Sequence, residues 1–261
     1  MTTHNIQAER VFIGKGSVIH PSAIIRGISG VSKEIKIGDN CYIGENVQII
    51  CDDFQLGDYC KIHHHTNIHG YLPCILGHNA WVGQFTIIDS IGGMQIGNNC
   101  GIGAHSQLWS HIKFGDVLEG CKFKTERKMI IGNDVWFVGH CIVSPIVASD
   151  KSMAMVGSVV TKNMEFNRIY AGSPAKDISD KVGNQFLEIS ADEKFKNMKA
   201  HLEKFGDNRS IKIVMNNEEV KFDDDFTYFV INDRKYKKMQ SEVEVAFMKY
   251  LLPDKAKFTP Y

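Results

Sequence analysis

One histidine of the chain stands where a proton acceptor could take part in a reaction. His111 follows Ser110 at the end of a regular repeat segment and opens a long polar stretch, in a sequence with eleven histidines. An imidazole ordinarily has a pKa near 6.5 and can take a proton from a hydroxyl or an amine at cellular pH. The position therefore predicts a general base, with a solvated loop histidine as the alternative.

A cluster of histidines suggests a second kind of chemistry. Four of them lie between Lys61 and Gly70, and the interval between His64 and His69 resembles two of the three zinc ligands of γ-class carbonic anhydrases. A catalytic zinc needs three protein ligands and one open position. The preceding segment, residues 48–54, reads QIICDDF and holds no histidine. We therefore expect no metal and keep the zinc enzyme as an alternative.

A repeated hexapeptide must position these residues. The phrase aliphatic, Gly, polar, polar, small, any recurs in register at Ile37–Tyr42, Ile43–Gln48, Leu56–Lys61, Leu76–Trp81, Ile96–Gly101 and Ile131–Trp136. A period of six fits neither a helix nor a plain strand. It predicts a coil with three short flat faces, in which the aliphatic and small residues point inward and glycine permits the corners.

The cysteines fit the same coil. There are seven, with no CxxC pair, which argues against a disulfide framework and against a cysteine-bound zinc. The small internal position of the repeat is held by cysteine four times, at Cys41, Cys60, Cys100 and Cys141. We expect these four to be core residues.

The repeat divides the chain into regions. Residues 1–10 form an N-terminal segment, and residues 11–180 are predicted to be the β-helix, interrupted by an external loop at about 113–128 where the period fails. A long loop in a regular scaffold is a functional candidate. Residues 184–261 predict a small α+β domain, with helices at 190–205 and in SEVEVAFMKYLL and strands in IKIVM, VKF and YFVIN. The fold class is mainly β.

The segment from Ile131 to Ile178 resembles the closing portion of hexapeptide-repeat acetyltransferases, the family of galactoside, maltose and streptogramin acetyltransferases. The phrases IGNDVWFVGHCIV, VGSVVTKNM and AGSPAKDI carry the resemblance, which covers roughly residues 11–180 with the earlier repeats. It implies a left-handed β-helix, a homotrimer, and acetyl-coenzyme A in a groove between subunits. The implied reaction acetylates a hydroxyl or amino group of a sugar, whether free, nucleotide-linked or part of a surface polysaccharide.

The resemblance also implies roles for single residues. His111 occupies the place of the catalytic histidine, and Trp136, which follows 25 residues later, that of its tryptophan partner. Gly139 stands where the family offers a backbone N–H to the thioester oxygen. For coenzyme A the resemblance points to a further set with small or basic side chains, namely Val156, Gly157, Ser158, Thr161, Lys162 and, for phosphate, Lys176.

The acceptor site departs from the family pattern. Sugar O-acetyltransferases of the family place an Asn and acidic residues before the catalytic histidine, whereas this chain offers Gln84 and Asp89. We predict acceptor contacts from Gln84, Asp89 and His105, with plain corner residues as the alternative.

The overall charge excludes some partners. Thirty basic and thirty acidic side chains give a formal net charge of zero, so no global field attracts nucleic acid or an anionic membrane. The N-terminus has no basic segment followed by an apolar run, and no stretch of roughly 18 apolar residues occurs. A cytoplasmic protein is predicted, and a non-catalytic β-helix scaffold is the third alternative.

Overall fold

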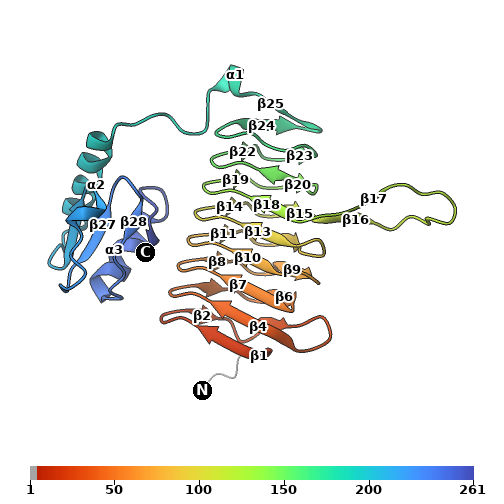
Figure 1. The fold of residues 1–261 in the computed structure, drawn as a ribbon, viewed down its shortest axis with the longest axis horizontal. Coiled ribbons are helices and arrows are strands. Elements are labelled where there is room, and N and C mark those ends of the chain that lie inside the picture. Colours follow the sequence, from red (N-terminus) through yellow and green to blue (C-terminus); the bar gives the residue numbers. More distant parts are fainter. Residues whose placement is uncertain (1–4) are drawn as a thin grey trace. The chain divides into compact units, whose positions relative to one another are not determined.

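The computed structural model describes residues 5–261, which form two compact units, one ending at Phe186 and one formed by Leu187–Tyr261. The first unit is a stack of coils (Figure 1). The change in composition after residue 180 therefore lies a few residues before the boundary between the units.

Each coil contributes one short parallel strand to each of three faces, called A, B and C. Face A contains β3 (Ile24–Arg26), β6 (Gln48–Cys51), β9 (Asn67–Gly70), β12 (Ile87–Asp89), β15 (Gln107–Leu108), β20 (Ile142–Val143) and β23 (Val159–Val160). Face B contains β4 (Ser32–Ile37), β7 (Asp53–Leu56), β10 (Cys74–Leu76), β13 (Met94–Ile96), β18 (Met129–Ile131) and β21 (Val147–Ala148). Face C contains β2 (Val18–Ile19), β5 (Tyr42–Ile43), β8 (Lys61–Ile62), β11 (Trp81–Val82), β14 (Gly101–Ile102), β19 (Trp136–Phe137), β22 (Met153–Ala154) and β24 (Ile169–Gly172).

The chain runs from B to C to A in every coil, so three edges separate the faces, called edge BC, edge CA and edge AB. The first strand, β1 (Asn5–Ile13), pairs with both β3 and β4. The predicted start of the β-helix near residue 11 was therefore wrong, because its strands begin by Asn5. The last strand, β25 (Ala175–Asp177), folds back antiparallel on β24.

The axis of the coil is filled by the residues that the repeat placed there. The leading aliphatic side chains are at most 4% exposed: Ile37, Ile43, Leu56, Leu76, Ile96 and Ile131. The four cysteines of the small internal position, Cys41, Cys60, Cys100 and Cys141, are free thiols buried in the same core. The predicted fold class, a mainly β, left-handed parallel β-helix with a small C-terminal α+β extension, is confirmed.

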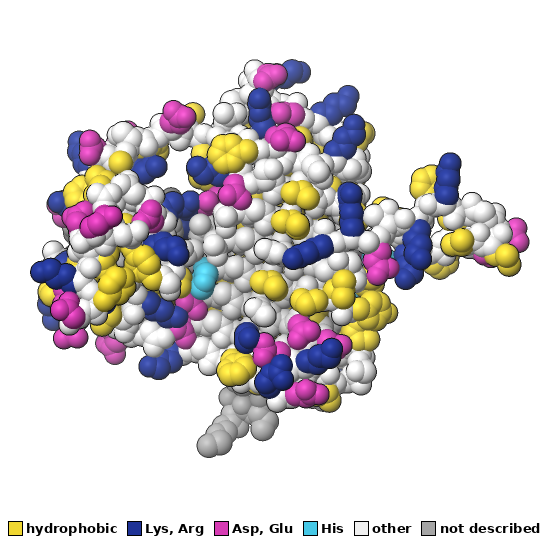
Figure 2. Space-filling view, in the orientation of Figure 1, with side chains coloured by type: hydrophobic (Ala, Val, Ile, Leu, Met, Phe, Trp, Pro, Cys, Tyr) yellow, Lys and Arg dark blue, Asp and Glu magenta, His cyan; other side chains and the backbone are white. Residues whose placement is uncertain are grey.

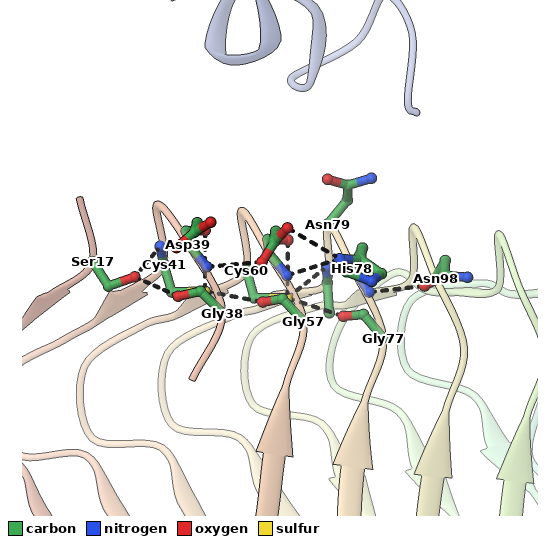
Figure 3. Close-up of polar contacts among 12 residues, drawn as sticks. Ser17, Gly38, Asp39, Cys41, Gly57, Cys60, Gly77, His78, Asn79 and Asn98 are labelled. Atoms are coloured by element: carbon green, nitrogen blue, oxygen red, sulfur yellow. Dashed lines mark hydrogen bonds and ion pairs between the residues drawn. The ribbon is translucent and has the colours of Figure 1, made fainter. Parts of the chain in front are cut away.

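Side chains at edge BC form a ladder that links successive coils (Figure 3). The residue after each corner glycine accepts a hydrogen bond from the backbone N–H of its counterpart in the coil before. Asp58 Oδ1 accepts from Asp39 N at 2.8 Å, His78 Nδ1 from Asp58 N at 2.9 Å, and Asn98 Oδ1 from His78 N at 2.8 Å. The ladder continues through Asn133 and Asp150. The ladder supplies acceptors for backbone N–H groups at the corners, which the strand pairing within the three faces does not satisfy.

This ladder yields a stability prediction. Replacing Asn98 with Leu removes the acceptor of the His78 N–H, so we expect the free energy of unfolding to fall by about 1–3 kcal/mol. Asn98→Asp keeps an oxygen at the same place and is the matched control. Urea denaturation of the two variants measures the difference. Equal losses in both would show that the ladder bond does not stabilise the coil.

The chain leaves the coil at edge AB as a hairpin. The segment predicted as a loop at 113–128 contains an antiparallel ribbon of β16 (His111–Lys113) and β17 (Lys124–Glu126), which projects from the stack (Figure 1). The segment predicted as an irregular loop is thus partly regular. Its apolar side chains face solvent, with Phe114, Leu118 and Phe123 at 102%, 92% and 76% exposed (Figure 2).

The base of the hairpin is closed by backbone and side-chain contacts. Arg127 N donates to Ser110 O at 3.1 Å, so the chain returns to the coil where it left it. The Arg127 side chain donates through Nε to Pro145 O at 3.0 Å on the next coil.

The second unit is a small α+β fold. Its sheet has the order β26 (Ile211–Val214), β27 (Thr227–Val230), β28 (Lys235–Tyr236) and β29 (Thr259–Pro260). Two helices accompany it, α2 (Ala191–Phe205) and α3 (Glu242–Leu251), each capped by a serine that accepts a backbone hydrogen bond. Both predicted helices are present, whereas VKF at 220–222 is not a strand, because Val220 ends the short helix η1 (Asn217–Glu219). Within residues 5–261 no helix is long and apolar enough to cross a membrane.

Candidate active site

The structure brings His111 and Asp89 together at edge AB. Asp89 ends β12, and because Ile88 pairs with Leu108, it lies below Trp109 on the next coil. The chain turns at Ser110, and the His111 ring comes to lie over the carboxylate of Asp89. The distance from His111 Nδ1 to Asp89 Oδ1 is 2.9 Å. The carboxylate is fully buried, whereas 19% of the His111 side chain reaches solvent.

The hydrogen bonds around Asp89 indicate the tautomer of the neutral His111 imidazole. Asp89 Oδ1 also accepts from Ser110 N at 3.0 Å and from Ser110 Oγ at 2.6 Å. An oxygen that takes these donors is an unprotonated acceptor, so His111 Nδ1 carries the hydrogen. The lone pair then lies on Nε2, the nitrogen turned away from Asp89, which is the form that a general base requires.

Serine and tryptophan residues beside the pair hold it in place. Ser110 Oγ accepts from Gly92 N at 2.8 Å while it donates to Asp89, so the turn before His111 is tied to the coil below. The Trp109 ring lies 6.3 Å from the His111 ring, and its Nε1 donates to Gln107 at 3.2 Å. Sequence reasoning named neither Ser110 nor Trp109 as a functional residue, although both directly precede His111.

A second group of predicted residues meets at edge CA. Gly139 O accepts from Gly157 N at 3.0 Å, so the two glycines lie on adjacent coils. Gly139 has a φ of +148°, a backbone conformation that L side chains rarely adopt. Its counterpart in the next coil is Val156, which has no acceptor side chain to extend a ladder like that of edge BC. Within residues 5–261 the Gly139 N–H makes no hydrogen bond, and Gly139 is a buried residue.

A column of stacked rings runs up the same edge and stops below Gly157. His65, Phe85, His105 and His140 all adopt left-handed φ angles between 51° and 59°. Their ring centroids are 5.0, 5.0 and 4.8 Å apart in that order. The next position is Gly157, also left-handed at φ +73°, and a Cβ there would meet nothing within 4 Å. The column therefore ends at an open space.

Trp136 is the first residue of β19 on face C and follows the edge BC corner. Its side chain is 44% exposed, and the indole covers Gly101 on the coil below. A Cβ at Gly101 would come within 2.9 Å of Trp136 Cδ1, so the glycine makes room for the ring.

The other predicted residues are distributed over the two edges. Asp89, predicted as an acceptor contact, lies buried behind His111 instead of in the open. Gln84 and His105 lie at edge CA, where Gln84 O accepts from His105 N at 2.9 Å and His105 belongs to the ring column. Val156 is 61% exposed, whereas the Ser158 hydroxyl is buried and donates to Met155 O at 2.7 Å. Thr161, Lys162 and Lys176 are exposed.

One copy of the chain does not unite these groups. His111 and Asp89 belong to edge AB, whereas Gly139 and Gly157 belong to edge CA, and face A lies between the two edges. A reaction that uses both edges therefore needs two copies of the chain.

The histidines considered for zinc do not converge. His64 lies at edge CA beside the rings of His65 and Phe85, and His69 lies at the other end of β9, at edge AB. No group of three or more His, Cys, Asp or Glu side chains that could hold a metal occurs in the part of the chain from residue 5 onward.

The fold and the edge site define a hexapeptide-repeat β-helix in which a buried carboxylate is paired with a partly exposed imidazole. No protein-family model matches the chain. The bifunctional protein GlmU of Anaplasma marginale (strain Florida) is 33% identical over 109 residues, which is 40% of this chain and 23% of that protein. The chain thus spans less than a quarter of the length of that relative.

Solved structures that the chain matches include two acyltransferases. The polySia specific acetyltransferase NeuO is 18% identical with a TM-score of 0.42, over 77% of this chain and 97% of that one. A mutant of AntD, an N-acyltransferase from Bacillus cereus, in complex with dTDP and coenzyme A, is 17% identical with a TM-score of 0.44, over 75% and 90% of the two chains. Both are acyltransferases by name.

Proposed function

We propose that the chain is an acetyl-coenzyme A-dependent acetyltransferase that modifies a hydroxyl or amino group of a sugar, with His111 as the general base. The observation that carries the proposal is the 2.9 Å contact between His111 Nδ1 and the buried Asp89 carboxylate, which leaves Nε2 free to accept a proton. The choice of a sugar or a nucleotide-linked sugar as the acceptor rests on the resemblance of residues 131–178 to the acetyltransferases of sugars.

The residues then have the following roles in the reaction. Acetyl-coenzyme A supplies the activated acyl group. His111 Nε2 takes the proton from the attacking hydroxyl or amine, and Asp89 stabilises the imidazolium that forms. The Gly139 N–H donates to the oxyanion of the tetrahedral intermediate, and His111 returns the proton to the departing thiolate. A base of this kind contributes about 10²–10⁴-fold to the rate, and an oxyanion donor about 10²–10³-fold.

The proposed assembly is a cytoplasmic homotrimer. Edge AB of one copy would face edge CA of the next, so that His111 and Gly139 come from different subunits. A contact between two different edges is a head-to-tail interface. Such interfaces close into a ring when the rotation from one subunit to the next completes a circle, and three triangular coils related by a three-fold axis meet this condition. The proposal of a neighbouring subunit on this side of the coil is supported by the exposed apolar side chains of the hairpin, which are Phe114, Leu118 and Phe123.

The end of the ring column gives a test of the coenzyme A groove. Gly157→Phe should place a fifth ring on the column and fill the space in which we propose that the pantetheine arm lies. Because ring side chains already adopt the left-handed conformation at this edge, the variant should fold. We expect the KM for acetyl-coenzyme A to rise about tenfold or more, with the KM for the acceptor nearly unchanged. Initial rates over both substrates measure this, and equal rises would place the groove elsewhere.

The activity itself is tested by a screen for acceptors. The protein is incubated with acetyl-coenzyme A and single free sugars or nucleotide sugars, and the released thiol is followed with a thiol-reactive dye. We expect thiol release that depends on the acceptor and is absent in His111→Ala. Release that is independent of every acceptor, or equal in both proteins, would contradict the proposal.

A further inference from the structure

A second imidazole faces the buried carboxylate from the coil below. His69 lies in β9, and the strand register pairs it with Asp89 of β12. Its Nε2 is 3.4 Å from Asp89 Oδ2. His69, Asp89 and His111 therefore follow one another along edge AB.

The two carboxylate oxygens of Asp89 differ in their hydrogen-bond partners. Oδ1 accepts from Ser110 N, Ser110 Oγ and His111 Nδ1. Oδ2 is buried and makes no hydrogen bond with any residue from 5 to 261. A buried carboxylate oxygen without compensation is costly. The 3.4 Å contact with His69 falls short of a hydrogen bond, but a positive charge at that distance still compensates it.

The surroundings of His69 favour that positive charge. Its Nδ1 lies 2.8 Å from Asn67 Oδ1, while the Asn67 amide nitrogen points to Gln48 Oε1 at 3.5 Å. Both ring nitrogens of His69 thus face oxygen acceptors. Only the protonated ring has a donor on each nitrogen. His111 differs, because it has one carboxylate oxygen at Nδ1 and an unoccupied Nε2.

We propose that His69 is a positioning residue, which in its protonated form holds the second oxygen of Asp89 and offsets part of its charge. Asp89 alone would stabilise the imidazolium form of His111 more strongly. With His69 charged, the attraction between Asp89 and the His111 imidazolium is weaker. His111 then stays neutral, and able to accept a proton, down to a lower pH. Only the activity measurements below rest on the proposed function.

The other ionisable groups near His69 and His111 are the same in the parent protein and in a His69 variant. Opposite His111 in the hairpin ladder lies Glu126, whose carboxylate pairs with Lys113 at 3.2 Å, and Arg127 follows it. Asp52 lies on the coil below His69. The pKa of Cys74 is raised by its contact with Cys51 and by burial, so this thiol stays neutral near pH 7 and adds no charge.

The test compares His69→Gln with His64→Gln, which makes the same change on the same coil at edge CA. The full-length protein is labelled at its histidine rings, and the titration of the His111 ring is followed by NMR in parallel with the pH profile of turnover. In His69→Gln we expect the midpoint of the His111 titration and the acidic limb of the turnover profile to move to higher pH by about half to one unit. The reason is that the Asp89 carboxylate, without the charge of His69, stabilises the protonated His111 ring more strongly. Turnover on the alkaline plateau should stay within about twofold of the parent. His64→Gln should match the parent.

If the midpoint of the His111 titration in His69→Gln stays in place or moves to lower pH, the proposal is overturned. A fall in turnover of this variant that is equal at every pH overturns it as well. The two readouts also separate this inference from the proposed function. If the NMR midpoint of His111 moves while activity does not depend on His111, the coupling stands and the role of His111 as the base fails.

Discussion

His111→Ala is expected to lower turnover by about 10²–10⁴-fold while acetyl-coenzyme A still binds, because the substitution removes the proton acceptor and leaves edge CA intact. The acidic limb of the pH profile should disappear as well, since no imidazole remains to be protonated in that range. Calorimetric titration with acetyl-coenzyme A and steady-state kinetics over pH measure the two effects.

The control for this variant is His64→Ala, which removes an exposed imidazole from another edge. It should keep the parental turnover and pH profile. A His111→Ala enzyme that retains more than about a third of parental turnover would make His111 a bystander. His105, one of the predicted acceptor contacts, is then the next histidine to change, although the structure places it in the ring column at edge CA.

Two defective variants should restore activity when they are assembled together. If a site takes His111 from one subunit and Gly157 from the next, co-expressed His111→Ala and Gly157→Phe chains form some sites with both native residues. With equal amounts and random mixing in a closed ring, about a quarter of the sites are native, so about a quarter of parental activity should return at low acetyl-coenzyme A. Either variant alone should remain nearly inactive under that condition.

The matched control carries both substitutions in one chain and is co-expressed with the native chain. Sites shared between subunits predict about a quarter of parental activity for this mixture as well, whereas sites within one chain predict about half. Activity that stays at the level of the separate variants in the first mixture would place both residues of each site in one chain. Light scattering that shows an active 29.4 kDa monomer would exclude the shared site altogether.

The hexapeptide phrase was sufficient to predict the β-helix, because a period of six leaves few ways to bury one aliphatic and one small residue per repeat. It also placed the four core cysteines. The first strand was missed, since β1 precedes the first clear glycine corner and pairs with two faces at once. The ribbon in the external segment was missed because its strands carry no hydrophobic alternation.

The pairing of Asp89 with His111 could not be predicted by counting residues. The strand register puts Asp89 below Trp109, and only the turn at Ser110 brings the ring two residues further on back over the carboxylate. A carboxylate before the histidine therefore suggested an acceptor contact, whereas the structure buries Asp89 in contact with His111. The contact of His69 with Asp89 follows from the regular coil length, but it acquires meaning only once Asp89 is known to be buried.

The closed base of the hairpin makes the projecting segment an exchangeable part. Since Arg127 N meets Ser110 O, the coil below and the coil above are continuous whatever lies between these two residues. Changes in the length or composition of the ribbon beyond Lys113 would thus leave the scaffold and the carboxylate–imidazole pair unaltered. The core of the coil therefore places no demand on the length of the ribbon.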